Sequence, residues 1–137
     1  MGSTAGRRAP LIALATIALG VALSTVASAT TVTRHQNPHY RVTASLSPTQ
    51  VAVGCRLTVS FTVTNTTDHA HTVSIEYQFK GPSFGEASGL APFRLKPHAT
   101  WTTTFTHRAT EAGSYKAIIR AGDTLGTSHA TATATAG

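Results

Sequence analysis

Period-two alternation of apolar and polar residues is the main pattern in this chain. The clearest example runs from residue 55 to residue 64, where every second side chain is a large apolar one: Leu57, Val59, Phe61 and Val63. A β-strand points successive side chains to opposite faces, so this segment predicts a strand with one dry face. The segment from Val73 to Phe79 follows the same rule. Two half-buried strands of this kind need a second apolar layer to cover them.

Shorter stretches of the same alternation extend over the rest of the chain. They predict strands over residues 40–46, 51–53, 93–95, 101–107, 115–121 and 128–134. Turn-forming residues separate these segments, and no stretch after residue 29 has the 3.6-residue period of an amphipathic helix. The last strand has small side chains and is predicted to be a frayed edge. Residues 81–89 contain three glycines and a proline, and they are predicted to form a loop.

About seven strands with no helix between them predict an all-β fold, an antiparallel two-sheet sandwich. Three segments carry a resemblance to known modules. They are Leu57 to Asn65, Leu95-Lys96-Pro97 before the strand at Trp101, and Gly113-Ser114-Tyr115-Lys116-Ala117. Together these segments resemble bacterial immunoglobulin-like modules of the CARDB or fibronectin type III-like kind, over about residues 40–135. The resemblance implies an immunoglobulin-like β-sandwich.

Tyr115 carries the most specific part of this resemblance. Gly-x-Tyr at the start of the penultimate strand resembles a tyrosine corner, in which the phenol hydroxyl bonds to a nearby backbone group. The alternative is an ordinary half-buried aromatic side chain. Where antibody-type domains have their two cysteines, this chain has Ala117 and Phe61. The antibody-type disulfide is therefore excluded.

The first 29 residues have the composition of an export signal. Arg7 and Arg8 precede an apolar run that ends at Leu23, and Ala27-Ser28-Ala29 then offers small residues for cleavage. The alternative is a retained membrane anchor, but the run is shorter than the roughly 20 residues that a spanning helix needs. We expect a secreted chain with no integral membrane span after cleavage. Its expected segments are a signal peptide (1–29), a flexible leader (30–39) and the sandwich (40–135).

Composition narrows the possible partners. The 137 residues carry a net charge of +6 and are only 12% charged, and their number suits one packed domain. After residue 29 the basic residues never form a run of three, so nucleic acid is not an expected partner. A protein or an anionic cell-wall polymer is compatible with the dispersed positive charge. Cys55 is the one cysteine; we expect it to be buried, and the alternative is a disulfide-linked dimer through Cys55.

Histidine is the residue type that stands out, with seven in the chain. His69 and His71 would share one face of an extended strand, and Asp68 is adjacent, so the three could bind Zn²⁺ or Cu²⁺. The alternative is an exposed turn that happens to contain histidines, and no other cofactor is expected. His35 and His39 fall in the predicted leader, where only adventitious metal binding is expected. Asn65-Thr66-Thr67 is a formal N-glycosylation sequon in a turn expected to be exposed.

Sequence patterns of catalysis are missing. The chain has no close pair of carboxylates in an apolar setting, no Gly-x-Ser-x-Gly elbow and no glycine-rich phosphate loop. We therefore expect a non-catalytic binding or interaction module at or near the cell envelope. An exported metal-binding protein and a secreted enzyme inhibitor are the alternatives. The expected contact surfaces are the loops 65–70, 81–89 and 109–113, which carry Asp68, Phe84, Glu86 and Glu111.

Overall fold

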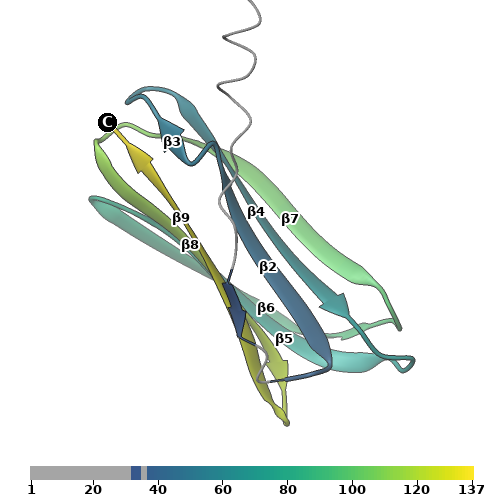
Figure 1. Ribbon diagram of the computed structural model, residues 1–137. Coiled ribbons are helices and arrows are strands. Elements are labelled where there is room, and N and C mark those ends of the chain that lie inside the picture. Colours follow the sequence, from purple (N-terminus) through teal and green to yellow (C-terminus); the bar gives the residue numbers. More distant parts are fainter. Residues whose placement is uncertain (1–31, 35–36) are drawn as a thin grey trace, which may run out of the picture.

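The computed structural model describes residues 32–34 and 37–137, which form nine β-strands in two sheets (Figure 1). The six-stranded sheet has the order β1-β9-β8-β5-β6, with β3 also paired to β9, and the three-stranded sheet has the order β2-β4-β7. The strands are β1 (Val32–Arg34), β2 (Tyr40–Ser47), β3 (Gln50–Val51), β4 (Arg56–Asn65), β5 (His71–Gly81), β6 (Phe84–Leu95), β7 (Thr100–Arg108), β8 (Gly113–Asp123) and β9 (Gly126–Ala136).

The predicted all-β fold with two sheets is confirmed. Two of the nine strands, β1 and β3, have three residues or fewer, which leaves seven long strands. Every pairing is antiparallel except that of β3 with β9. No helix in residues 32–34 and 37–137 is long and apolar enough to cross a membrane. The predicted signal peptide, residues 1–29, lies outside the described residues.

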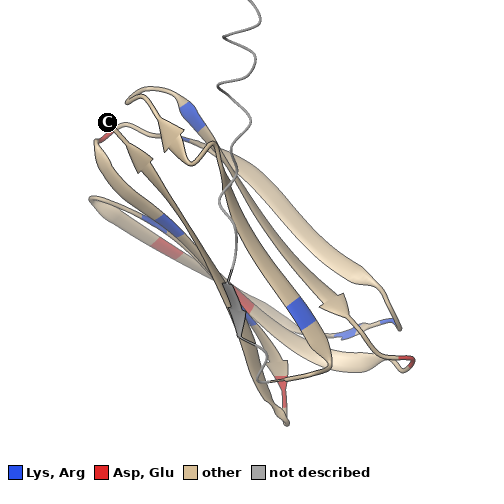
Figure 2. Ribbon diagram, in the orientation of Figure 1, with Lys and Arg blue, Asp and Glu red and all other residues tan. Residues whose placement is uncertain are grey.

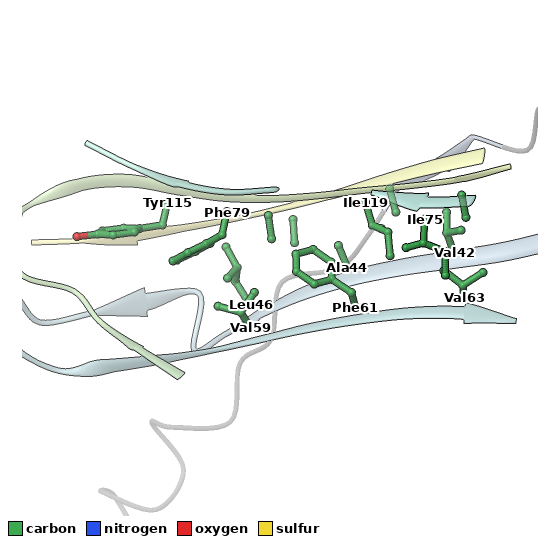
Figure 3. Packing of buried hydrophobic residues seen from close by; sticks show 14 of the residues in the cluster. Val42, Ala44, Leu46, Val59, Phe61, Val63, Ile75, Phe79, Tyr115 and Ile119 are labelled. Atoms are coloured by element: carbon green, nitrogen blue, oxygen red, sulfur yellow. The ribbon is translucent and has the colours of Figure 1, made fainter. Parts of the chain in front are cut away.

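The core lies between the two sheets, where the predicted alternation puts it (Figure 3). In β4 every second side chain is fully buried, and Phe61 is the largest of them. In β5 the same holds for Val73, Ile75 and Phe79, while Tyr77 is half-buried. Register explains how β2 joins this core, since Val42, Ala44 and Leu46 pair with the buried residues of β4. The predicted shared dry interior is confirmed.

Tyr115 forms the tyrosine corner that its sequence context predicted. The ring is 1% exposed, and its hydroxyl donates a 2.9 Å hydrogen bond to the carbonyl of Glu111. The Glu111 amide in turn lies 3.3 Å from the same hydroxyl. A buried phenol needs a partner for its O–H, and a carbonyl four residues earlier provides one while it fixes the chain at the start of β8.

β9 is not the frayed edge that its small side chains predicted. β8 pairs with β9 along its whole length, and β1 and β3 pair with its other side. Its alanines at positions 130, 132, 134 and 136 are buried. β2 of the other sheet packs against β9. Small side chains therefore allow a close approach between the two sheets here, and do not indicate weak packing.

The loop predicted over residues 81–89 is also wrong. β5 runs to Gly81 and β6 starts at Phe84, so Pro82 and Ser83 alone connect the two strands. A side chain at Gly81 would collide with the rings of Phe84 and Tyr115. The glycine that looked like a loop residue therefore permits close packing inside a hairpin.

Two polar residues of the turns are placed differently from expectation. Cys55 was expected to be buried but is exposed. Gly54, whose φ is +96°, turns the chain immediately before it, and β4 begins only at Arg56, so the alternation of β4 does not extend to Cys55.

Asn65 is completely buried, although it starts the sequon of a turn expected to be exposed. Its side-chain amide donates to the carbonyls of His69 (2.7 Å) and Leu95 (3.0 Å).

The folded part of the chain begins before Tyr40. Val32–Arg34 pairs with β9, and Asn37, which falls in the predicted leader, is completely buried. Residues 37–39 therefore belong to the sandwich, as do the strand residues 32–34. The other leader residues, 30, 31, 35 and 36, lie outside the described part of the chain.

Candidate functional site

His39, His71 and Asp123 meet at one end of the sandwich. His39 lies just before β2, His71 is the first residue of β5 and Asp123 is the last residue of β8. The pairing of Ser74 with Gly122 aligns the start of β5 with the end of β8. The Thr66 amide donates a 2.9 Å hydrogen bond to the His39 carbonyl, which brings His39 to the turn before β5. The topology thus collects three potential ligands from distant parts of the sequence.

One ligand atom from each of the three side chains lies within 4.8 Å of the other two. Nδ1 of His39 is 3.0 Å from Oδ2 of Asp123, and these side chains are 23% and 14% exposed. The rings of His39 and His71 stack with their centroids 4.0 Å apart and an interplanar angle of 17°. Nε2 of His71 is 2.9 Å from the Thr67 hydroxyl. This contact orients the His71 ring and leaves its other nitrogen for another partner.

Asn37 holds the Asp123 carboxylate from the other side. Its Nδ2 donates to Oδ1 of Asp123 (2.6 Å) and to the carbonyl of Gly126 (3.0 Å). The Leu125 amide donates to the same Oδ1 at 2.9 Å. Oδ1 receives these two bonds, and Oδ2 is the oxygen that contacts Nδ1 of His39.

The pKa values of two groups at this site are shifted. Burial acts to raise the pKa of Asp123, but hydrogen bonds from His39, the Leu125 amide and Asn37 outweigh it and hold the pKa below its usual value. Burial also raises the pKa of the Tyr40 phenol to about 12, and the negative charge of Asp123 adds to that shift. At neutral pH the site therefore contains an ionised carboxylate and a neutral phenol.

A cleft of about 1090 Å³ opens beside these residues, and His39, His71 and Asp123 form part of its wall. Strands β5, β6, β8 and β9 and the β8–β9 turn contribute the remaining wall. Its polar wall includes an ion pair in which Nη1 of Arg120 is 3.5 Å from Oε1 of Glu76. Its apolar wall includes Leu90 and Leu125, and Leu125 is 63% exposed.

The structure brings only one member of the predicted metal set to this cluster. Nε2 of His98 lies 2.7 Å from Oδ1 of Asp68, and both of these side chains are mostly exposed. His69 is exposed, and its carbonyl accepts hydrogen bonds from Asn65 and Thr67. His71 alone joins the group with mutual ligand distances, and its partners are His39 and Asp123.

The other predicted contact residues lie elsewhere on the sandwich. Phe84 is half-buried and packs 4.8 Å from the His107 ring, measured between centroids. Glu86 is exposed on β6 and lines a smaller cavity of about 190 Å³ beside Tyr77 and Phe105. Glu111 is exposed and accepts a hydrogen bond from the Ser83 hydroxyl. None of these three residues borders the large cleft among the described residues.

Sequence reasoning missed His39 and Asp123. His39 falls in the predicted leader, and Asp123 lies 84 positions further along the chain. The available local signal was the sequence Asp123-Thr124-Leu125-Gly126, in which an aspartate and a glycine frame a tight turn. This signal predicts the hairpin, but only the tertiary pairing shows that the carboxylate faces two histidines.

No family model and no curated protein matches the sequence. Among solved structures, the CARDB domain of PF1109 from Pyrococcus furiosus is similar in its solution NMR form, with a TM-score of 0.51, 14% identity and coverage of 72% of this chain and 94% of that one. The crystal structure of that domain in complex with di-metal ions gives a TM-score of 0.50, 15% identity and coverage of 75% and 96%.

The alkylpurine DNA glycosylase AlkC of Pseudomonas fluorescens is also similar, at a TM-score of 0.46 and 16% identity. That match covers 79% of this chain, which spans only 30% of the glycosylase. Identities this low show the fold alone. The chain has the fold of a CARDB-like immunoglobulin module, as the sequence resemblance predicted.

Proposed function

We propose that this chain is an exported, non-catalytic immunoglobulin-like module that binds a partner at the cell envelope through the 1090 Å³ cleft. The cleft is the observation that carries the proposal. Its volume is slightly above the roughly 300–1000 Å³ that is usual for small-molecule sites. Its wall combines apolar side chains with a few fixed polar groups, which is the composition typical of binding sites.

Exposed apolar surface favours the same end of the molecule. Among the described residues, two large hydrophobic side chains are exposed, Val53 at 46% and Leu125 at 63%. Leu125 borders the cleft, whereas Val53 lies next to β3, which pairs with the opposite end of β9. We therefore place the apolar contact with the partner at Leu125, because it is the exposed large hydrophobic residue of the described chain that lines the cleft.

Two observations support a non-catalytic role. The fold is that of CARDB-like domains. The hydroxyl that contacts the His71 imidazole is that of Thr67, which also donates to Asn65 Oδ1 (2.8 Å) and contacts the His69 carbonyl (2.9 Å). Because this hydroxyl is engaged within its own turn, it is poorly placed to act as a nucleophile.

The charge distribution is compatible with an envelope partner. Figure 2 shows that lysine and arginine are scattered over both sheets and do not gather in one basic track. Scattered positive charge suits a weak general attraction to anionic surface polymers, while the cleft supplies a specific contact. Because the apolar side chains of Leu90 and Leu125 line the cleft, a protein of the envelope is the preferred partner, with a cell-wall polymer as the alternative.

Export is tested by expressing the full chain in the host bacterium and sequencing the N-terminus of the product. We expect the product in the medium or envelope fraction, with Thr30 as its first residue. A product confined to the cytoplasm and starting at Met1 would contradict export.

Binding is tested with whole host cells and the purified chain, by comparing Leu125→Asp with Val53→Asp. The second variant is the matched control, because it places the same charge on another exposed hydrophobic position. We expect Leu125→Asp alone to lose binding. Protease treatment of the cells separates a protein partner from a polymer. Equal binding by both variants would rule out the cleft as the contact surface.

A further inference from the structure

We infer that His39, His71 and Asp123 form a binding site for one divalent transition-metal ion of the Zn²⁺ or Cu²⁺ class. The inference is separate from the proposed function, since it needs neither export nor a partner in the cleft. It rests on the geometry of the three side chains, on the groups that hold them in place and on the access that the cleft provides.

The ligand spacing suits a single ion. Two ligands about 2.1 Å from one tetrahedral ion are about 3.4 Å from each other. The three ligand atoms already lie within 4.8 Å of one another, and Nδ1 of His39 is 3.0 Å from Oδ2 of Asp123. Small side-chain rotations would therefore complete the geometry. The ion would replace the direct contact between His39 and Asp123.

The donor types select the class of ion. Two imidazole nitrogens and one carboxylate oxygen are typical ligands of Zn²⁺ and Cu²⁺, whereas Ca²⁺ takes six to eight oxygen ligands and Mg²⁺ keeps an octahedral shell of oxygens. Cu²⁺ should bind more tightly than Zn²⁺, because divalent affinities rise to copper and fall again at zinc.

A second layer of hydrogen bonds holds two of the ligands. Asn37 and the Leu125 amide bind Oδ1 of Asp123, which leaves Oδ2 for the ion. Thr67 contacts Nε2 of His71, which leaves Nδ1 of that ring. Metal sites in proteins usually show such outer partners, because these fix the tautomer and the orientation of each ligand. If His39 and Asp123 only anchored the segment before β2, their own contact would be sufficient. The imidazole of His71 would then have no role at this site.

The site is open on one side. All three residues line the cleft, so a fourth coordination position is left for water or for a donor atom of a molecule in the cleft. The ion is therefore expected to exchange with chelators, unlike a structural ion enclosed by four protein ligands.

The test is calorimetric titration of the full chain, without a histidine tag and stripped with EDTA, using Zn²⁺ alone. We expect one ion per chain. His39→Phe keeps a ring that can stack on His71, and Asp123→Asn keeps a polar group of the same size, yet each should weaken zinc binding at least about 100-fold. The matched controls are Asp68→Asn and His69→Ala, which remove two residues of the set predicted from sequence. Both should bind as the wild type does.

A second readout covers the case in which a variant folds poorly. Zinc should raise the thermal unfolding midpoint of the wild type and of both controls, and leave that of Asp123→Asn unchanged. With Cu²⁺, electron paramagnetic resonance should show two coupled imidazole nitrogens in the wild type and one in His71→Ala. Absence of stoichiometric zinc binding would overturn the inference. So would binding that survives His39→Phe and Asp123→Asn but is lost in Asp68→Asn or His69→Ala. Cell binding is measured separately, so either hypothesis can fail alone.

Discussion

Nδ2 of Asn37 donates a 2.6 Å hydrogen bond to Oδ1 of Asp123, which lies 86 positions later in the chain. Asn37 is completely buried, and its own Oδ1 accepts a 2.9 Å bond from the His39 amide. One side chain thus contacts the carboxylate and the backbone of the histidine that faces it. Asn37 is therefore the residue that sets the relative position of two of the three proposed ligands.

Replacing Asn37 with alanine should weaken zinc binding by about 10–100-fold, because Asp123 would lose the partner that fixes its orientation. Ser128→Ala is the matched control. The Ser128 hydroxyl donates to the Asn37 carbonyl at 3.0 Å, so its loss loosens the same segment but leaves the Asn37 side chain on Asp123. Both variants should lose stability in urea unfolding, yet only Asn37→Ala should lose zinc affinity in calorimetry. An equal loss of zinc affinity in both variants would show that Asn37 has a structural role only.

Asn65→Asp should destabilise the fold by about 2–4 kcal/mol, although the two side chains have the same shape. The amide of Asn65 donates to the carbonyls of His69, Leu95 and Lys96, and none of these groups can donate to a carboxylate oxygen. The substitution would place a buried acceptor against other acceptors. Urea denaturation measures the effect. Gln50→Glu makes the same chemical change at an exposed position and should stay within about 0.5 kcal/mol of the wild type.

Tyr115→Phe should cost about 1–1.5 kcal/mol, because it removes the hydroxyl of the tyrosine corner and keeps the buried ring. The Glu111 carbonyl would lose its 2.9 Å hydrogen bond. Tyr77→Phe provides the comparison, since Tyr77 is half-buried and the described residues offer its hydroxyl no hydrogen bond. Thermal and urea unfolding of the two variants should differ by about the energy of one hydrogen bond. Identical stabilities would show that the corner contributes nothing to the fold.

Phe61→Ala should cost about 3–5 kcal/mol, because it leaves a cavity at a fully buried position in the middle of the central strand β4. The ring contacts both sheets, with Tyr77 at 5.1 Å and Phe105 at 6.4 Å between centroids. Leu125→Ala also shortens a large apolar side chain, but at 63% exposure it should change stability by less than about 0.5 kcal/mol. A loss below about 1 kcal/mol for Phe61→Ala would contradict its central place in the core.

The alternation of apolar and polar residues was enough to predict the sandwich, because burial on one face of a strand depends only on local parity. The buried face of Leu57 to Val63 is predicted in this way and is confirmed. The tyrosine corner at Tyr115, predicted from its resemblance to known modules, is confirmed as well. Composition gave wrong predictions at positions where small residues are needed for tertiary packing. The alanines of β9 and the glycine at position 81 permit close packing, which a single sequence cannot distinguish from an edge or a loop.

The candidate site was largely hidden from sequence reasoning. Spacing along one strand favoured His69 and His71, but the cluster combines a residue before β2, the start of β5 and the end of β8. Such a cluster depends on strand order and register, neither of which follows from local alternation. Only His71 was identified in advance. Cys55 illustrates the same limit. Alternation predicted that its side chain faces the core, but the turn at Gly54 takes Cys55 out of the strand and leaves it exposed.

Gly122→Ala should destabilise the fold by about 1–3 kcal/mol and also disturb the proposed metal site. Gly122 is buried next to Asp123, and an added Cβ would lie 2.9 Å from the Cα of Thr127 and closer still to the Gly126 carbonyl oxygen. Both obstacles are backbone atoms of the paired strand, so neither can rotate away. The β8–β9 hairpin would have to shift at the point where it presents Asp123.

Gly89→Ala is the matched control, because this glycine also lines the cleft and also lies in a strand, yet an added Cβ meets nothing within 4 Å. It should be neutral or stabilise by up to about 1 kcal/mol, since glycine in a strand loses more conformational freedom on folding than alanine. Urea unfolding gives the stabilities, and zinc calorimetry gives the affinities of the same two variants. If Gly122→Ala retained wild-type values in both, the close approach of β8 and β9 would be adjustable, and Asp123 would not depend on it.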